Sequence, residues 1–426
     1  MTDPNESSRR DFLAALGCAT LGSAAFPTAA ASAADQPSKI RPAADLPRRL
    51  QLTHADMGSL YPDLQKLVAD QPYADSFLGD RYSKFGDFQT AGRQRIFDSV
   101  LYRPEPVEPR PEIVDRVDCG DFIREKVVFS TSPHFRVPAY VLIPKKLSGP
   151  APAIVDLHSH GGMFVFGKEK VIDLGENHPA MVEYHERNYD GRPTATAFVR
   201  RGYVVISIDA FFFGERRLLM DADLAIGFDR GEYSLEETRR LNQQCSAKEG
   251  TLVKAMAFAG ITWPGIVFWD DIRTVDYLVS RPEVDAKRIG CVGISMGGYR
   301  SMFLAALDPR VRAACVVGFM STVRPMLQAH LDTHSNVHFV PGLHRYLDWP
   351  DVVSLHAPQP LLVQQCEQDR LFPRAAMHES VDKIAAIYAK AGAKDQFNGR
   401  YYDAPHRFTQ AMQDEAFDWF DRQLKG

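Results

Sequence analysis

Gly293-Ile294-Ser295-Met296-Gly297-Gly298 is the most informative stretch of this chain. It joins a predicted strand, residues 288–294, to a predicted helix, residues 297–307. A serine in so tight a strand-to-helix turn needs a glycine two positions to either side, because larger side chains would clash. The turn lifts the hydroxyl above the sheet, and the helix N-terminus favours developing negative charge. This context predicts that Ser295 is a catalytic nucleophile.

Strand and helix patterns alternate on both sides of this turn. Continuous apolar runs at residues 153–157 and 204–208 are typical of strands buried on both faces. An antiparallel pair of strands at 127–129 and 137–143 opens the series. Further strands are predicted at 313–317, 361–364 and 397–402. Helices are predicted at 194–201, 266–279, 375–389 and 408–424. The alternation predicts an α/β fold over residues 121–426, with a doubly wound, mostly parallel sheet.

Three other segments stand apart from this alternation. Residues 215–263 and 320–350 are too long for ordinary connections, and such segments usually form caps or lids over a site. We therefore expect two cap-like inserts. Residues 35–120 are rich in Pro, Arg and Asp, and their four closely spaced prolines, residues 104–111, predict a stiff connector. We expect this region to be an N-terminal extension that packs on the core.

The first 34 residues have the features of a twin-arginine signal peptide. Arg9-Arg10 precedes a mildly apolar stretch, residues 13–26, and Ala31-Ser32-Ala33 resembles a signal-peptidase site. We therefore expect export to the periplasm or the exterior. Cys18 follows Leu16-Gly17 and gives a weaker indication of lipid anchoring, since Ala15 matches that pattern poorly.

Composition sets broad limits on function. The 426 residues are 45% hydrophobic and 24% charged, which is ordinary for a globular protein with a large core. A net charge of −4 shows no excess of basic residues that would bind phosphate groups, so we expect no nucleic-acid partner. No apolar run approaches the ~20 residues of a membrane-spanning helix. Five scattered cysteines follow the predicted leader, which favours neither a disulfide framework nor a metal site.

A serine hydroxyl needs a base to activate it, and the base needs an acid to orient it. Where the nucleophilic serine sits on such a strand-to-helix turn, the order along the chain is serine, then acid, then histidine. Asp369 follows the strand at 361–364, and His406 follows the last strand at 397–402. We predict a Ser295–His406–Asp369 triad, with Glu367 as the nearby competitor for the acid and Asp348 or Asp351 as weaker ones.

A serine nucleophile that attacks a carbonyl also requires backbone N–H groups that stabilise the oxyanion of the tetrahedral intermediate. One donor should be Met296, the residue that follows the nucleophile. The other should come from His158-Ser159-His160-Gly161-Gly162, the loop after the strand at 153–157. We expect the amide of His160 or of Gly161, and the sequence favours neither over the other.

From about residue 127 to the C-terminus the chain resembles the α/β-hydrolase superfamily, in its dienelactone hydrolase-like and acetyl xylan esterase-like branch. The resemblance is carried by residues 138–144, 157–162, 214–216 and 281–285, together with Asp209 and Trp269-Asp270. It implies ester hydrolysis without a cofactor. Dienelactone hydrolases proper use a cysteine nucleophile, so the serine at 295 favours an esterase. The usual His-Gly pair of the oxyanion loop is replaced by His158-Ser159.

Three other functions are compatible with parts of the sequence. His158 and His160 resemble the His-x-His pair of metal-dependent amidohydrolases, although that reading leaves the serine turn without a role. A prolyl oligopeptidase-like peptidase would need a propeller, for which the region before residue 120 is too short. An inactive binding protein on a hydrolase scaffold would not need an intact triad.

Aromatic residues near strand ends suggest the substrate. Phe211, Phe212 and Phe213 follow the strand at 204–208, at the sheet edge where α/β proteins bind ligands. Trp263, His334 and His338 lie in the inserts. If these rings line the site, they leave a small acyl pocket and favour short acyl esters, such as acetyl esters, of carbohydrate or another extracellular substrate. The alternative is that they only pack the inserts onto the core.

Overall fold

The computed structural model describes residues 52–221, 223 and 229–426. The predicted signal peptide, including Arg9, Arg10 and Cys18, and the start of the extension lie outside the described residues.

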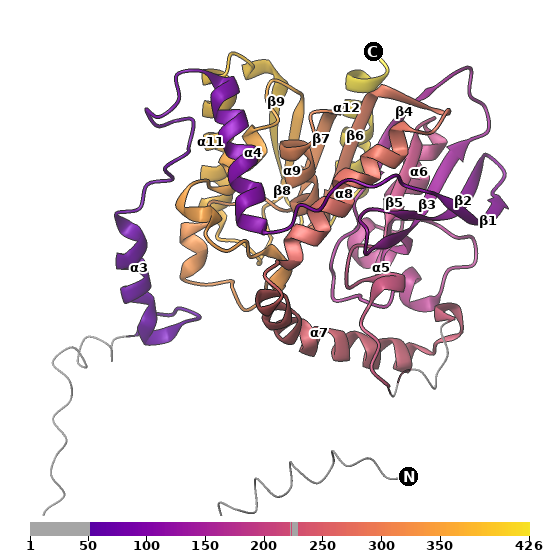
Figure 1. The fold of residues 1–426 in the computed structure, drawn as a ribbon, viewed down its shortest axis with the longest axis horizontal. Helices are drawn as coiled ribbons and strands as arrows, with labels where there is room; N and C mark the ends of the chain where they lie inside the picture. The colour runs from indigo at the N-terminus through magenta and orange to yellow at the C-terminus, as the bar shows by residue number, and fades with distance from the viewer. Residues whose placement is uncertain (1–51, 222, 224–228) are drawn as a thin grey trace, which may run out of the picture. The chain divides into compact units, whose positions relative to one another are not determined.

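One nine-stranded mixed sheet organises the chain, in the order β1-β2-β3-β5-β4-β6-β7-β8-β9 (Figure 1). The first three strands and β5 pair antiparallel, whereas β5, β4, β6, β7, β8 and β9 pair parallel. The strands are β1 (Glu112–Asp118), β2 (Phe122–Ser130), β3 (Arg136–Pro144), β4 (Ala151–Asp156), β5 (Val204–Ile208), β6 (Val284–Ile294), β7 (Val311–Val317), β8 (Leu361–Cys366) and β9 (Phe397–Tyr402).

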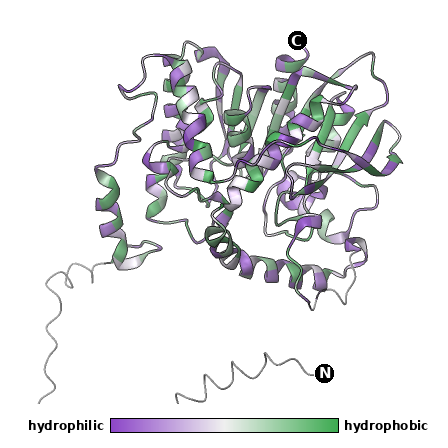
Figure 2. Ribbon diagram, viewed as in Figure 1, coloured by the Kyte–Doolittle hydropathy of each residue, from purple (hydrophilic) through white to green (hydrophobic). Residues whose placement is uncertain are grey.

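Helices cover both faces of the sheet. The hydrophobic cluster on one face includes residues of α4 (Phe85–Val100), α8 (Trp263–Val279), α9 (Met296–Leu307), α10 (Trp349–Ser354) and α11 (Arg374–Lys390). The cluster on the other face includes α5 (Pro179–Tyr189), α6 (Thr194–Arg200) and α12 (Gln410–Leu424). The central strands are largely hydrophobic, while the helices show both kinds of surface (Figure 2). This arrangement confirms the predicted doubly wound α/β class.

The strand order indicates which edge of the sheet carries the crevice for a ligand. From β4 the chain passes to β5 on one side, and β6 then lies on the other side of β4. The crevice of an open α/β sheet lies beyond the carboxyl ends of the strands at such a reversal. The loop after β4 and the turn after β6 both emerge there, and these are the segments predicted to carry the oxyanion hole and the nucleophile.

Two features of the N-terminal region were not predicted. β1 is an edge strand in which six of the seven residues are exposed, so its sequence lacks the alternation of a half-buried strand. α3 (Tyr61–Ala69) has no buried residue. By contrast, Phe88, Ile96 and Val100 of α4 are buried in the cluster that covers the sheet.

The two inserts differ in structure. The first contains α7 (Leu235–Phe258), a helix that begins with a capping box of Ser234 and Glu237. The second has only short 3-10 turns, at Arg324–Leu327, Asn336–His338 and Leu343–Arg345. Among the described residues, no single helix is long and apolar enough to cross a membrane; α7 and α8 pass that test only as a pair bent by 84°.

Candidate active site

Ser295 occupies a sharp turn between β6 and α9. Its backbone has φ 60° and ψ −125°, a conformation that costs energy for a residue with a side chain. Glycine is required at 293 and 297, because a Cβ at either position would collide with the carbonyl oxygen of Leu157 at the end of β4. The close approach that these glycines permit brings the turn against the loop that follows β4.

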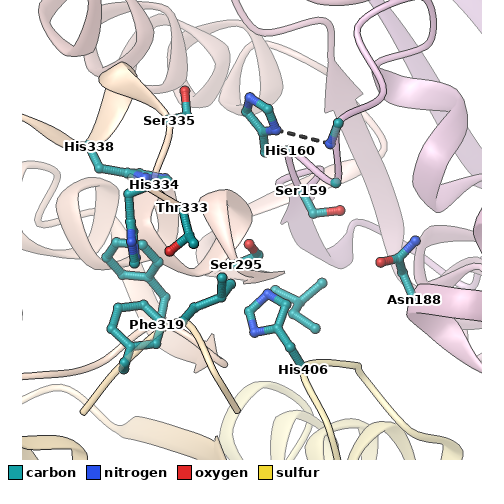
Figure 3. Close-up of a pocket in the computed structure, with 15 residues that line it drawn as sticks. Ser159, His160, Asn188, Ser295, Phe319, Thr333, His334, Ser335, His338 and His406 are labelled. Carbon is teal, nitrogen blue, oxygen red and sulfur yellow. Dashed lines mark hydrogen bonds between the residues drawn. The ribbon is translucent and has the colours of Figure 1, made fainter. Parts of the chain in front are cut away.

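His406 and Asp369 meet next to this turn. Nδ1 of His406 lies 2.6 Å from Oδ2 of Asp369, and the other carboxylate oxygen accepts the N–H of Leu371 at 2.9 Å. A carboxylate can only accept, so Nδ1 carries the proton and Nε2 is left with a free lone pair. Nε2 has no hydrogen-bond partner among the described residues, and its ring lines the same cavity as Ser295 (Figure 3).

The competing acids face other partners. Glu367 pairs with Arg374 at 2.5 Å and with His378 at 3.0 Å. Asp348 and Asp351 form the capping box of α10, and Lys383 lies 2.6 Å from Asp351. Of the four acids considered from the sequence, Asp369 is the one that contacts His406.

The loop after β4 is held by its side chains and by Lys170. The side-chain nitrogen of this fully buried lysine donates to the carbonyl oxygens of Ser159, at 2.8 Å, and His160, at 3.1 Å. In a trans peptide the N–H points opposite to the C=O, so the amides of His160 and Gly161 face away from Lys170. Neither amide donates to a described residue, whereas the amide of Gly162 donates to Nδ1 of His160 (Figure 3). The amides of His160 and Gly161, the two alternatives for the second oxyanion donor, therefore both remain without a partner.

A family model described as "Abhydrolase family" matches residues 64–418. The chain belongs to the Abhydrolase family. This α/β-hydrolase is 27% identical to "Putative hydrolase YtaP" of Bacillus subtilis (strain 168) over 303 residues, which are 71% of this chain and 88% of that protein.

Two solved structures show the same fold. A putative acetyl xylan esterase from Bacteroides fragilis NCTC 9343 is 19% identical, with a TM-score of 0.61 over 80% of this chain and 82% of that one. A glucuronoyl esterase from Solibacter usitatus is 16% identical, with a TM-score of 0.54 over 83% of this chain and 99% of that one. The family and the fold agree with the resemblance inferred from the sequence.

The cavity of this α/β-hydrolase has a volume of about 230 Å³. Its polar end is formed by the loop after β4 and by Asn188 of α5. Its other end is formed by rings, namely Phe319, His334, His338 and Phe372 (Figure 3). Burial lowers the pKa of His338 well below its ordinary value and also lowers that of His334, so both imidazoles are neutral near pH 7.

The remaining predicted aromatic residues lie elsewhere. Phe211, Phe212, Phe213 and Trp263 are not among the residues that line this cavity. The indole N–H of Trp263 donates to the carbonyl oxygen of Phe211 at 3.1 Å, and Phe213 stacks on Phe164 with ring centroids 5.1 Å apart. Trp263, at the start of α8, also packs against Phe212 and Phe213, with ring centroids 5.3 and 6.4 Å apart, so these rings bury one another. The expectation that they line the site is not met.

Glu249 is a site residue that sequence reasoning missed. From α7 its carboxylate accepts His160 Nε2–H at 2.9 Å, the hydroxyl of Ser335 at 2.9 Å and the N–H of Asn336 at 3.0 Å. Burial alone raises its pKa, but these donors hold the pKa of Glu249 below its ordinary value. One carboxylate thus joins the loop after β4 to both inserts. No local pattern distinguishes it from the other charges of α7.

The His158–His160 pair does not match a metal site. His158 is fully buried, its Nε2 accepts the N–H of Ala210 at 3.1 Å, and its Nδ1 lies 3.0 Å from the carbonyl oxygen of Ser159. Both ring nitrogens are thus already engaged. Among the described residues, no group of three or more His, Cys, Asp or Glu side chains is placed to hold a metal ion.

Proposed function

We propose that the protein is a serine hydrolase that cleaves carboxylic esters through an acyl-enzyme, with Ser295 as nucleophile, His406 as base and Asp369 as orienting acid. The observation that carries the proposal is the cavity that Ser295 shares with His406, whose other ring nitrogen is fixed by Asp369 at 2.6 Å. Membership of the Abhydrolase family supports it.

The proposed reaction has two halves. Ser295 Oγ attacks the ester carbonyl carbon while its proton passes to His406 Nε2, and the amides of Met296 and of His160 or Gly161 stabilise the oxyanion. The C–O bond to the alcohol then breaks, and the alcohol leaves with the proton from His406. Water attacks the acyl-enzyme, gives a proton to His406 and releases the acid as Ser295 regains its hydrogen.

The orientation of the ester in the cavity follows from the proton transfer. The alcohol oxygen must lie against His406, because His406 protonates it. His406 also borders an open cleft of about 850 Å³, which includes Arg187, Arg370 and Arg407. A large alcohol therefore extends into this cleft, and the acyl group occupies the ring-lined end of the smaller cavity.

We propose short acyl esters of a carbohydrate as the substrate class. The closed acyl end is formed by His334, His338 and two phenylalanines, and this leaves room for a small group. Two structural neighbours are named as an acetyl xylan esterase and a glucuronoyl esterase, which supports a sugar ester.

A chain-length series tests this proposal. We expect kcat/KM for p-nitrophenyl esters to be highest at two to four carbons, and acetate to be released from acetylated xylan. Ser295→Ala serves as the blank for both assays. A maximum at eight carbons or more would contradict the short acyl group, and no acid release from any glycan ester would contradict the carbohydrate.

A further inference from the structure

A second cavity lies behind the acyl end of the catalytic cavity. It has a volume of about 350 Å³, larger than the 230 Å³ of the catalytic cavity. Its lining is largely apolar and comes from the second insert, including Met326, Leu327 and Leu331, and from Val68 of α3. Among the residues that line the two cavities, His338 is the one that they share.

His338 is built as a fixed wall between the two spaces. Its side chain is buried, and its ring packs edge-on against Tyr299 and obliquely against Phe319, each at 4.9 Å between centroids. The hydroxyl of Tyr299 also donates to the carbonyl oxygen of His338 at 3.3 Å, which fixes the backbone. These contacts leave the ring little freedom to swing out of the wall.

The chemistry of this wall is unusual. Both imidazole nitrogens are buried without a hydrogen-bond partner among the described residues. Buried polar atoms without partners destabilise a folded protein, and an alkyl side chain of similar size would avoid that cost. The ring is thus held in the wall by its packing against Tyr299 and Phe319 and not by hydrogen bonds from its nitrogens.

We propose that His338 sets the acyl-chain length that the enzyme accepts, by closing the acyl end of the catalytic cavity against the apolar space behind it. The inference rests on the proposed function, since it assigns the acyl group to that end. With the imidazole in place, an acyl chain stops at the wall. Without it, a longer chain passes into an apolar cavity that already exists.

His338→Ala tests the wall directly. Each methylene buried gains a factor of roughly four in binding, so we expect the ratio of kcat/KM for octanoate to that for acetate to rise at least about tenfold. Two matched variants should leave the ratio near the wild-type value. His338→Leu keeps a side chain in the wall, and Leu327→Ala enlarges the second cavity without opening it.

A second substitution tests whether the gain on long chains depends on the space behind the wall. In the His338→Ala background, Leu327→Trp refills the space behind the wall and should reverse most of the gain. If His338→Ala does not fold, His338→Val removes fewer contacts and should show a smaller rise in the same ratio. An unchanged ratio in a folded, active His338→Ala or His338→Val variant would overturn the inference. Loss of the proposed function is distinguishable, because the wild type would then lack serine-dependent activity on every chain length.

Discussion

Asp369 and Glu367 are two residues apart, yet their surroundings give them different roles. Asp369 is buried, and its carboxylate contacts His406 and the N–H of Leu371. Glu367 contacts Arg374 and His378, two residues of α11. The two carboxylates therefore face different partners, and the one that faces His406 is that of Asp369.

Replacing Asp369 by asparagine should lower kcat by roughly 10⁴-fold, because an amide in this place can donate to Nδ1 and so favours the wrong tautomer of His406. Glu367→Gln is the matched control and should change kcat by less than about tenfold. Steady-state kinetics with a short ester measure both, and the melting temperature verifies folding. The opposite ranking of the two variants would assign the acid to Glu367.

At the scale of elements, one carboxylate of α7 links the loop after β4 to the second insert. Glu249 of α7 is the carboxylate at which the loop after β4 meets the turn at Asn336–His338. The same turn carries His338, so Glu249 links the position of the acyl wall to that of the oxyanion loop. α7 itself lies along the rim of the sheet and contributes few residues to its core (Figure 1).

Glu249→Ala should lower kcat/KM by up to ~10²-fold, because a displacement of about 1 Å in a positioned group has effects of this size. Hydrogen exchange should rise in residues 335–338. Glu236→Ala removes an exposed carboxylate from the first turn of the same helix and should leave both readouts unchanged. Wild-type kinetics and exchange in Glu249→Ala would mean that the inserts are held by other contacts.

The elements also show what the sequence could and could not predict. Strands such as β5 were predicted because a strand buried on both faces has a continuous apolar run in its sequence. Helices such as α9 were predicted because apolar residues recur in the sequence at helical spacing. β1 was missed because its residues are mostly exposed. The roles of Glu249 and Lys170 could not be predicted, since each depends on partners 10 or more residues away that only the fold brings together.

At the scale of the whole molecule, the strand reversal beside β4 brings Ser295 and the loop after β4 to one crevice, and His406 lines the same cavity. The order serine, acid, histidine along the chain sufficed to predict this convergence, because each residue follows a strand whose carboxyl end reaches the same edge. The lining of the acyl end was predicted only in part. His334 and His338 are there, whereas Phe319 and Phe372 replace the four rings expected from residues 211–213 and 263.

Export through the twin-arginine route is a prediction that rests on the first 34 residues of the chain. Changing Arg9 and Arg10 together to lysine should leave the precursor in the cytoplasm, because the twin-arginine route reads that pair. Immunoblots of cytoplasmic and periplasmic fractions and of the culture medium measure the distribution. Changing Arg41, which lies beyond the predicted cleavage site, is the control. Normal export of the double variant would contradict the twin-arginine assignment.

The central claim is that Ser295 is the nucleophile of a serine hydrolase, and the most direct measurement is covalent labelling of the intact protein with a fluorophosphonate. We predict one adduct per chain, on the peptide that contains Ser295, together with loss of ester hydrolysis. Ser159→Ala removes another serine hydroxyl from the same cavity and should still be labelled, whereas Ser295→Ala should be neither labelled nor active. Labelling at another residue, or hydrolysis that persists in Ser295→Ala, would contradict the account.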